Sequence, residues 1–202
     1  MREPVILEPA SSLARYGSNI ANAFYSLKSD FPVQHWQDTL EYVRLGLGED
    51  LEDVGTRADA GGGRHALTVK YRDMTIPAVA LSDGVLAYLA HVALFRLSGS
   101  ASLVAFDEPE LHLHPALLMR VLGFFESLAE ERPVLLATHS DRLLDALEHP
   151  ERSAVLCELD EDRATRLLRP DAEKLKLWLE KFTMGEMRSG GHESALFAER
   201  PG

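Results

Sequence analysis

Two adjacent acids, Asp107 and Glu108, directly follow an apolar run at residues 103–106. A short apolar run predicts a buried strand, and carboxylates at the end of such a strand are held rigidly at the edge of a sheet. The first carboxylate of such a pair can support Mg²⁺ in phosphoryl transfer, and the second can orient or deprotonate an attacking water. The alternative is a pair of solvated acids at a strand end.

A second candidate site precedes another apolar segment. The sequence Leu81, Ser82, Asp83, Gly84 comes before residues 85–97, which are apolar almost all round and predict a buried helix. Free N–H groups at the start of a helix favour a phosphate. Gly84 would let the phosphate approach the backbone, and the Ser82 hydroxyl could donate to it. The simpler interpretation is a Ser/Asp helix cap.

A third candidate is His139, which follows the apolar run at residues 134–138. A histidine directly after a buried strand could contact a γ-phosphate or the attacking water. The alternative is a polar loop residue beside a helix cap.

The elements around these sites are predicted from periodicity. Apolar residues spaced by three or four predict helices at about 19–28, 34–47, 85–97, 115–128, 141–147 and 172–182. Alternation and short apolar runs predict strands at 67–71, 75–80, 102–106, 134–138, 154–157 and 165–168. The first two strands form an antiparallel hairpin. Apolar strands separated by helices predict an α/β fold with a parallel sheet covered on both faces.

Composition limits the class of protein. The chain has 202 residues, a net charge of -11 and one cysteine, Cys157. This length fits one domain, or one domain with a small lobe. The acidic balance argues against a generally basic nucleic-acid binder, and one cysteine excludes a disulfide framework. The absence of an export signal and of a long apolar segment predicts a cytoplasmic protein with no membrane partner.

Several other residues have plain structural interpretations. His112 and His114 could ligate a transition metal beside the acids, but their position before a helix argues against a dedicated site. Cys157 lies in an apolar strand and is expected to be a buried thiol. His91 is expected to pack in the core. The cationic residues between 163 and 181 are interleaved with acids, which favours a solvated face over a DNA groove.

The order and separation of the three sites resemble those of ABC-type ATPases. Leu81 to Gly84, residues 107–115 and residues 138–140 are similar to the RecF-like and OLD-like AAA ATPases, relatives of the chromosome-maintenance ATPases. The resemblance covers about residues 77–159.

The resemblance implies ATP and Mg²⁺ as cofactors and a role for each candidate residue. Ser82, Asp83 and Gly84 would form the signature loop, which contacts the γ-phosphate of ATP held by the opposite subunit. Asp107 would be the Walker B aspartate that supports Mg²⁺ through water, and Glu108 the catalytic glutamate. His139 would be the switch histidine. His114 falls in the D-loop region, which usually lies across the dimer interface.

Two departures from the family pattern matter. The longer signature and the D-loop of transporter ATPases are missing, which argues against a transporter. No phosphate loop of the Walker A type, G-x-x-x-x-G-K-S/T, occurs in the chain. The three glycines at residues 61–63 are followed by neither the lysine nor the hydroxyl residue of that motif. The chain is therefore expected to be the carboxyl-terminal part of an ABC-type P-loop ATPase domain. Its regions would be a helical segment at 12–50, a β-hairpin region at 51–80, a core at 81–170 and a terminal helix and tail at 171–202.

The resemblance thus predicts an ATPase in which ATP binding and hydrolysis drive dimerisation, in a process such as DNA repair or phage defence. Expected partners are a second copy of the chain, the missing N-terminal ATPase lobe, and DNA through the full-length protein. The competing hypothesis is a non-catalytic interaction subunit that binds a complete ATPase. The coding sequence upstream of Met1 discriminates between them. On either hypothesis, this chain alone is expected neither to bind ATP tightly nor to hydrolyse it.

Overall fold

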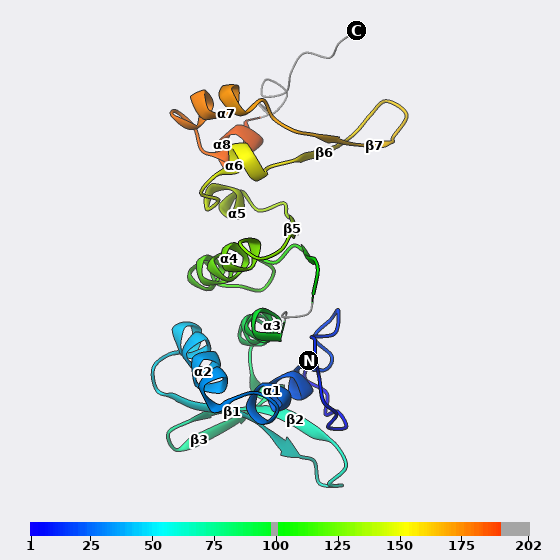
Figure 1. The fold of residues 1–202 in the computed structure, drawn as a ribbon, viewed down its shortest axis with the longest axis vertical. Coiled ribbons are helices and arrows are strands. Elements are labelled where there is room, and N and C mark those ends of the chain that lie inside the picture. The colour runs from blue at the N-terminus through cyan, green and yellow to red at the C-terminus, as the bar shows by residue number, and fades with distance from the viewer. Residues whose placement is uncertain (98–100, 191–202) are drawn as a thin grey trace. The chain divides into compact units, whose positions relative to one another are not determined.

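The computed structural model describes residues 1–97 and 101–190, and the chain divides into two compact units (Figure 1). The first unit is Met1–Ala137, and the second begins at Thr138. Within the described residues, no helix is long and apolar enough to span a bilayer.

Three helices build the core of the first unit. They are α1 (Ile20–Ser29), α2 (Val33–Leu47) and α3 (Asp83–Leu97). Helix α1 begins after Gly17, which has a φ of 63°, and after Asn19, whose side-chain oxygen accepts from the amide of Ala14. Helix α3 is buried along most of its length, as its apolar sequence predicts. All three predicted helices are confirmed to within one or two residues.

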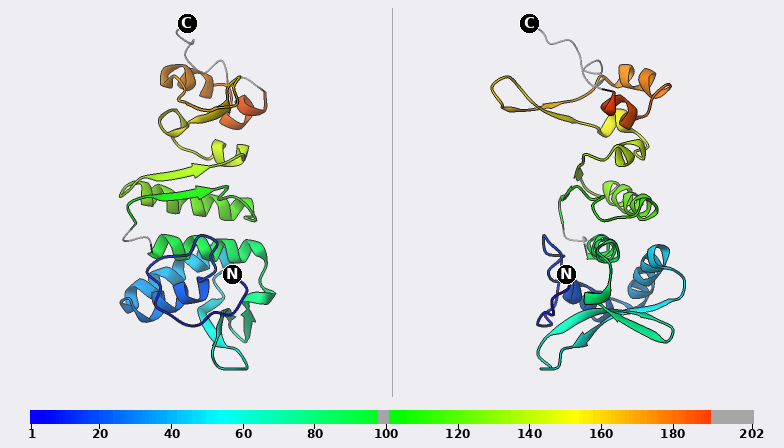
Figure 2. Two further views of the ribbon diagram at one scale, coloured as in Figure 1. Left: turned by 90° about the vertical axis from the view of Figure 1, so that its right-hand side faces the viewer. Right: turned by 180° about the vertical axis from the view of Figure 1, so that it is seen from behind.

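A three-stranded antiparallel sheet packs against α1 and α2 (Figure 2). Its strands are β1 (Leu51–Ala58), β2 (His65–Tyr71) and β3 (Met74–Pro77). The predicted hairpin is β2–β3, which ends at Pro77 and is followed by the short 3-10 helix η1 (Ala78–Ala80). Strand β1 lies within the expected β-hairpin region at 51–80, ahead of the two strands predicted there. It is a full strand because Leu51 and Val54 supply buried positions.

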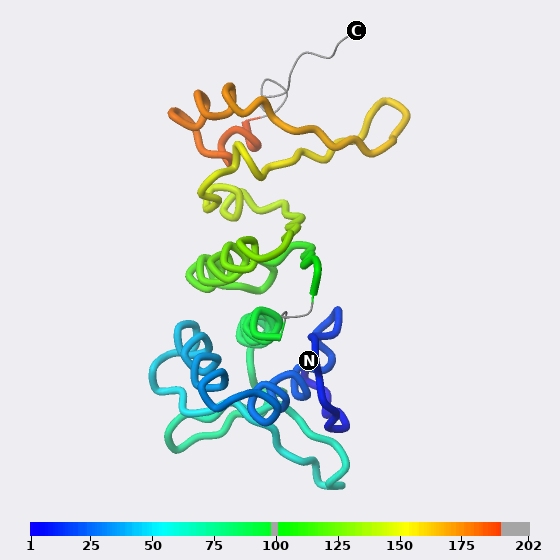
Figure 3. Tube along the Cα trace, viewed as in Figure 1, coloured from blue at the N-terminus to red at the C-terminus, as the bar shows by residue number. Residues whose placement is uncertain are grey.

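The N-terminal segment pairs with the same sheet. Val5 and His65 exchange two backbone hydrogen bonds, of 2.9 and 2.7 Å. Figure 3 traces this segment in dark blue before it enters α1.

A parallel strand pair completes the first unit. Strands β4 (Val104–Asp107) and β5 (Val134–Ala137) pair in parallel, and α4 (Pro115–Ala129) connects them. The predicted strands and the predicted start of α4 at Pro115 are confirmed. Helix α4 buries one apolar face, including Val121 and Phe125. The structure differs from the expectation that the sheet is covered on both faces, because Leu135 of β5 is 59% exposed.

The second unit holds the remaining elements. They are α5 (Asp141–Asp145), α6 (Pro150–Ser153), β6 (Leu156–Leu159), β7 (Thr165–Leu168), α7 (Ala172–Leu179) and α8 (Met184–Ser189). The two strands pair with each other in an antiparallel hairpin, so β6 does not extend the β4–β5 pair as a third parallel strand. The prediction that Cys157 is a buried thiol is also wrong. The Cys157 side chain is exposed. Most of the predicted terminal tail, residues 191–202, lies outside the described residues.

Candidate functional site

The loop that begins α3 carries Ser82, Asp83 and Gly84. The amide of Val85 donates to Ser82 Oγ over 3.2 Å, and the amide of Leu86 donates to the Ser82 carbonyl over 3.1 Å. Ser82 is therefore a helix cap, as the simpler interpretation predicts. Capping uses the hydroxyl only as an acceptor, so its proton can still be donated to a ligand. Because Ser82 is exposed, such a ligand would meet no steric barrier at the side chain.

Arg2 fixes this loop from the N-terminal segment. Its guanidinium donates to the Leu81 carbonyl over 2.8 Å and to Asp83 Oδ1 over 2.6 Å. The hydrogen bond and the charge of Arg2 hold the pKa of Asp83 below its ordinary value. An ionised Asp83 would repel a phosphate at the start of α3, and the adjacent guanidinium offsets that charge. The sequence carries no signal for this contact, since the two residues are 81 positions apart.

Gly84 lies against the loop that follows the acid pair. An ideal Cβ at position 84 would lie 2.7 Å from the carbonyl oxygen of His112. Glu108, the second acid of the pair, and His112, in the loop after it, have positive φ angles of 48° and 65°. The structure thus brings the start of α3 into contact with the loop after β4, and each of these segments adjoins one of the candidate sites that the sequence singles out.

Asp107 and Glu108 lie at the carboxyl end of β4, as predicted. Asp107 pairs in register with Ala137 of β5, and the Glu108 amide donates to the Ala137 carbonyl over 2.7 Å. The Asp107 side chain is exposed and that of Glu108 is half-buried. A single exposed carboxylate suits Mg²⁺, which usually takes one or two protein carboxylates and completes its shell with phosphates and water. Glu108 adopts a left-handed conformation that non-glycine residues avoid.

His139 belongs to the second unit, where it precedes α5. Ser140 caps that helix by accepting from the amide of Leu143 over 3.4 Å, and the Ser140 amide donates to Thr138 Oγ1 over 2.9 Å. The His139 side chain is exposed. Its partner is Arg188 of α8, whose Nη2 lies 3.3 Å from His139 Nδ1. Arg188 is not among the site residues that the sequence predicts. The signal that places its helix is the Thr-x-x-Glu pattern at Thr183.

The two histidines after the acid pair have structural roles. His114 caps α4, because its Nδ1 accepts from the amide of Ala116 over 3.3 Å. His112 supplies the carbonyl that meets Gly84. Across residues 1–97 and 101–190, no three histidine, cysteine or acidic side chains gather into a group that could hold a metal ion.

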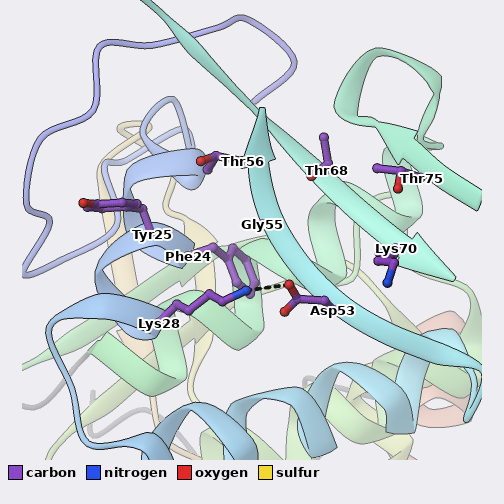
Figure 4. Close-up of a pocket in the computed structure, with 9 residues that line it drawn as sticks. All are labelled: Phe24, Tyr25, Lys28, Asp53, Gly55, Thr56, Thr68, Lys70 and Thr75. Carbon is purple, nitrogen blue, oxygen red and sulfur yellow. Dashed lines mark hydrogen bonds and ion pairs between the residues drawn. The ribbon is translucent and has the colours of Figure 1, made fainter. Parts of the chain in front are cut away.

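A pocket of about 340 Å³ lies between α1 and the antiparallel sheet (Figure 4). It is lined by Phe24, Tyr25, Lys28, Asp53, Gly55, Thr56, Thr68, Lys70 and Thr75. Both of its lysines are already paired with acids. Lys28 lies 2.5 Å from Asp53, and Lys70 lies 2.6 Å from Glu52. The pocket therefore offers an anion no uncompensated positive charge, and none of the predicted site residues lines it.

The fold defined by these elements is that of an ABC-type ATPase head. One similar structure comes from a study of ATP-driven dimerisation and DNA-stimulated activation of SMC ATPases. It has a TM-score of 0.51 and 16% identity, over 73% of this chain and 95% of that one. An SMC head bound to the C-terminal winged-helix domain of ScpA gives a TM-score of 0.51 and 14% identity, over 83% of this chain and 58% of that one. At these identities the likeness concerns the fold alone.

Residues 18–145 match the family described as "AAA domain, putative AbiEii toxin, Type IV TA system". The match spans more than half of the chain, and the chain belongs to this AAA domain family. A curated relative is protein ea59 of Escherichia phage lambda, 38% identical over 82 residues. That match covers 40% of this chain and 15% of the phage protein, so the shared segment is a small part of the relative.

Proposed function

We propose that this chain is the C-terminal half of an ATP-hydrolysing ABC-type ATPase of the RecF-like and OLD-like branch, in which ATP binding and hydrolysis drive dimerisation. The observation that carries the proposal is the contact between Gly84 and His112. It packs a helix start, which would serve the ATP of a second subunit, against the loop after the acid pair, which would serve the ATP of its own subunit.

Each residue has a defined task in this proposal. Asp107 supports Mg²⁺, which supplies charge neutralisation on the phosphates of bound ATP. Glu108 accepts the proton of the attacking water as general base. Ser82 and Gly84 donate to the γ-phosphate of ATP held by a second subunit, using the hydroxyl and the free amides of the first turn of α3. His139 senses the γ-phosphate.

The fold relatives support the choice of partners. The SMC ATPases in one of these structures undergo ATP-driven dimerisation and DNA-stimulated activation. By analogy, the partners proposed here are a second copy of this chain and, through the full-length protein, DNA. The process served would be of the DNA repair or phage defence kind.

A second candidate function is a non-catalytic subunit that binds a complete ATPase. The observation that favours it is the sequence itself, which has no Walker A lysine. Such a subunit would complete or block the site of its partner through the same loop at residues 82–84.

The experiment that tests the proposal joins this chain to a phosphate loop. If the coding sequence upstream of Met1 encodes a Walker A motif in frame, the full-length protein is produced. If it does not, the chain is mixed with a complete ATPase from the same organism. Turnover is compared for the wild type, Glu108→Gln and the control Glu130→Gln, an exposed acid after α4.

We expect Glu108→Gln to bind ATP without turnover, because the amide keeps the size of the carboxylate but cannot accept the proton. The control should turn over normally, and the 202-residue chain alone should bind no ATP in calorimetry at micromolar concentrations. Normal turnover by Glu108→Gln contradicts the proposal. If the chain changes the turnover rate of a complete ATPase equally with glutamate or glutamine at position 108, the chain is instead the interaction subunit.

A further inference from the structure

The side chain of Arg188 holds the loop that carries His139 at three points. Its Nη1 donates to the His139 carbonyl and, over 3.2 Å, to Asp141 Oδ1. Its Nη2 lies 3.3 Å from the ring nitrogen Nδ1 of His139. One guanidinium thus contacts the backbone, the ring and the neighbouring acid of the same loop. A planar fork of donors suits such a multipoint contact, which a lysine ammonium cannot reproduce.

The position of Arg188 follows from how α8 is built. Thr183 and Glu186 form a reciprocal capping box that starts the helix. Gly185 lets α8 approach α5 closely, because an ideal Cβ there would lie 2.6 Å from the Cβ of Asp141. The Gly185 amide donates to Asp145 Oδ1 over 2.7 Å. Met187, buried beside Leu175, secures the other side of the helix.

The ring contact determines where the proton of a neutral His139 resides. A guanidinium has donors and no acceptor, so Nδ1 must accept the hydrogen bond from Arg188. A neutral imidazole carries one proton, which is then on Nε2. The same contact fixes the ring in one orientation, with Nε2–H free to donate to a ligand.

We propose that Arg188 is the positioning residue of His139, which it holds as the Nε2–H tautomer so that this N–H is presented to a phosphate oxygen. The proposal rests on the phosphate-sensing role proposed for His139. It adds a residue, a tautomer and a direction of donation to that role. A residue that merely fastened α8 to α5 would act through Asp141 and would leave the ring of His139 unaffected.

The first test is nuclear magnetic resonance of the 202-residue chain, with ¹⁵N-labelled histidine, at about pH 8.5, where an ordinary histidine is neutral. The variants are Arg188→Met, which keeps the length of the side chain without its donors, and Arg188→Lys, which restores one donor. Arg142→Met is the matched control, because it removes a cation from α5 that has no described hydrogen bond to His139. The amide signal of Gly185 reports whether α8 stays docked.

In the wild type we expect His139 to carry its proton on Nε2, with Nδ1 at the chemical shift of a hydrogen-bonded acceptor. In Arg188→Met the Nδ1–H tautomer should increase severalfold, and the Nδ1 shift should lose its hydrogen-bonded character. Arg188→Lys should recover part of the wild-type spectrum, and the control should match the wild type. A proton on Nδ1 in the wild type, or an unchanged ring in Arg188→Met with Gly185 still docked, overturns the proposal.

The second test measures turnover in the assembly that contains a phosphate loop. Arg188→Met should lower kcat on the order of tenfold, the scale on which loss of an orienting partner acts, with little change in KM for ATP. The double variant with His139→Ala should be no slower than His139→Ala alone, because Arg188 acts only through that ring. Additive losses overturn the proposal. If Glu108→Gln turns over normally, the proposed function fails, while the tautomer measurement still decides the role of Arg188.

Discussion

Gly84 and the carbonyl oxygen of His112 are so close that no side chain fits between them. An ideal Cβ on Gly84 would lie 2.7 Å from that oxygen, and the neighbour is backbone, which cannot rotate away. Only glycine, which has no side chain, therefore allows the start of α3 and the loop after the acid pair to pack this closely.

Gly84→Ala should consequently destabilise the protein, although alanine is ordinarily the better helix former. We expect the free energy of unfolding to fall by about 1–3 kcal/mol, the usual cost of overpacking. The control is Gly123→Ala in α4, where a Cβ would meet nothing within 4 Å. That change should raise stability by up to about 1 kcal/mol. Denaturant unfolding of both variants measures the difference, and equal behaviour would contradict the close contact.

Ser82→Arg should leave the fold intact and prevent ATP-dependent dimerisation of the full-length protein. Ser82 is exposed, so the longer side chain enters solvent where a phosphate of the second subunit would dock. Loss of the cap should cost only about 1 kcal/mol. Size-exclusion chromatography with and without ATP measures the effect.

Mixing two full-length variants tests whether Ser82 acts on the ATP of the second subunit or on the ATP of its own subunit. A Ser82→Arg protein is mixed with a protein lacking the Walker A lysine, so that one composite site of the heterodimer receives both lesions and the other receives none. Partial ATPase activity should return. No recovery from two folded, heterodimerising variants would mean that Ser82 serves its own subunit.

The left-handed backbone of Glu108 should make its replacement by asparagine stabilising. Glu108 has a φ of 48°, a region that asparagine tolerates better than glutamate and that β-branched residues tolerate worst. Glu108→Asn should raise the free energy of unfolding by about 0.5 kcal/mol, and Glu108→Val should lower it by about 1–2 kcal/mol. Both should lack turnover in the assembly with a phosphate loop. A valine variant as stable as the wild type would refute the strain.

His91 should make the fold sensitive to acid. The ring is buried, stacks on Phe106 and hydrogen-bonds the Ala87 carbonyl through Nδ1 over 2.7 Å. Burial lowers the pKa of His91 below its ordinary value, only partly offset by the hydrogen bond to Ala87. Below about pH 6.5 the unfolded chain binds a proton that the folded chain excludes. Stability is therefore full above that pH and falls as the pH decreases.

His91→Phe, which keeps an aromatic ring against Phe106, should flatten this dependence. The slope of the free energy of unfolding against pH should decrease by at most about 1.4 kcal/mol per pH unit, the value for one proton. Some slope should remain, because burial also lowers the pKa of His35. Urea unfolding between about pH 5 and 7.5 measures it. Identical slopes in the variant and the wild type would contradict the buried, neutral histidine.

The sequence predicted those parts of the fold that local patterns determine. Helices α3 and α4 were found because the apolar run after Gly84 and the proline at 115 are strong local signals. The strand ends that carry Asp107 and His139 were found for the same reason. The β6–β7 pairing and the exposure of Cys157 were not, because an apolar strand looks the same whether or not a second layer covers it.

Contacts between distant segments explain the rest of what was missed. The bond from Arg2 to Asp83 and the fit of Gly84 against His112 depend on the tertiary fold and leave no local pattern. Arg188 differs from these two. The capping pattern at Thr183 predicts the start of its helix, but only the docking of Gly185 on Asp145 directs it to His139.

The exposure of Cys157 has a practical consequence for studies of self-association. As the only cysteine of the chain, it gives a single attachment point for a maleimide dye or spin label without any engineering. Under oxidising conditions, the same thiol can form a disulfide between two molecules, and such covalent dimers form without nucleotide. Measurements of ATP-dependent assembly therefore require a reductant or a Cys157→Ser background.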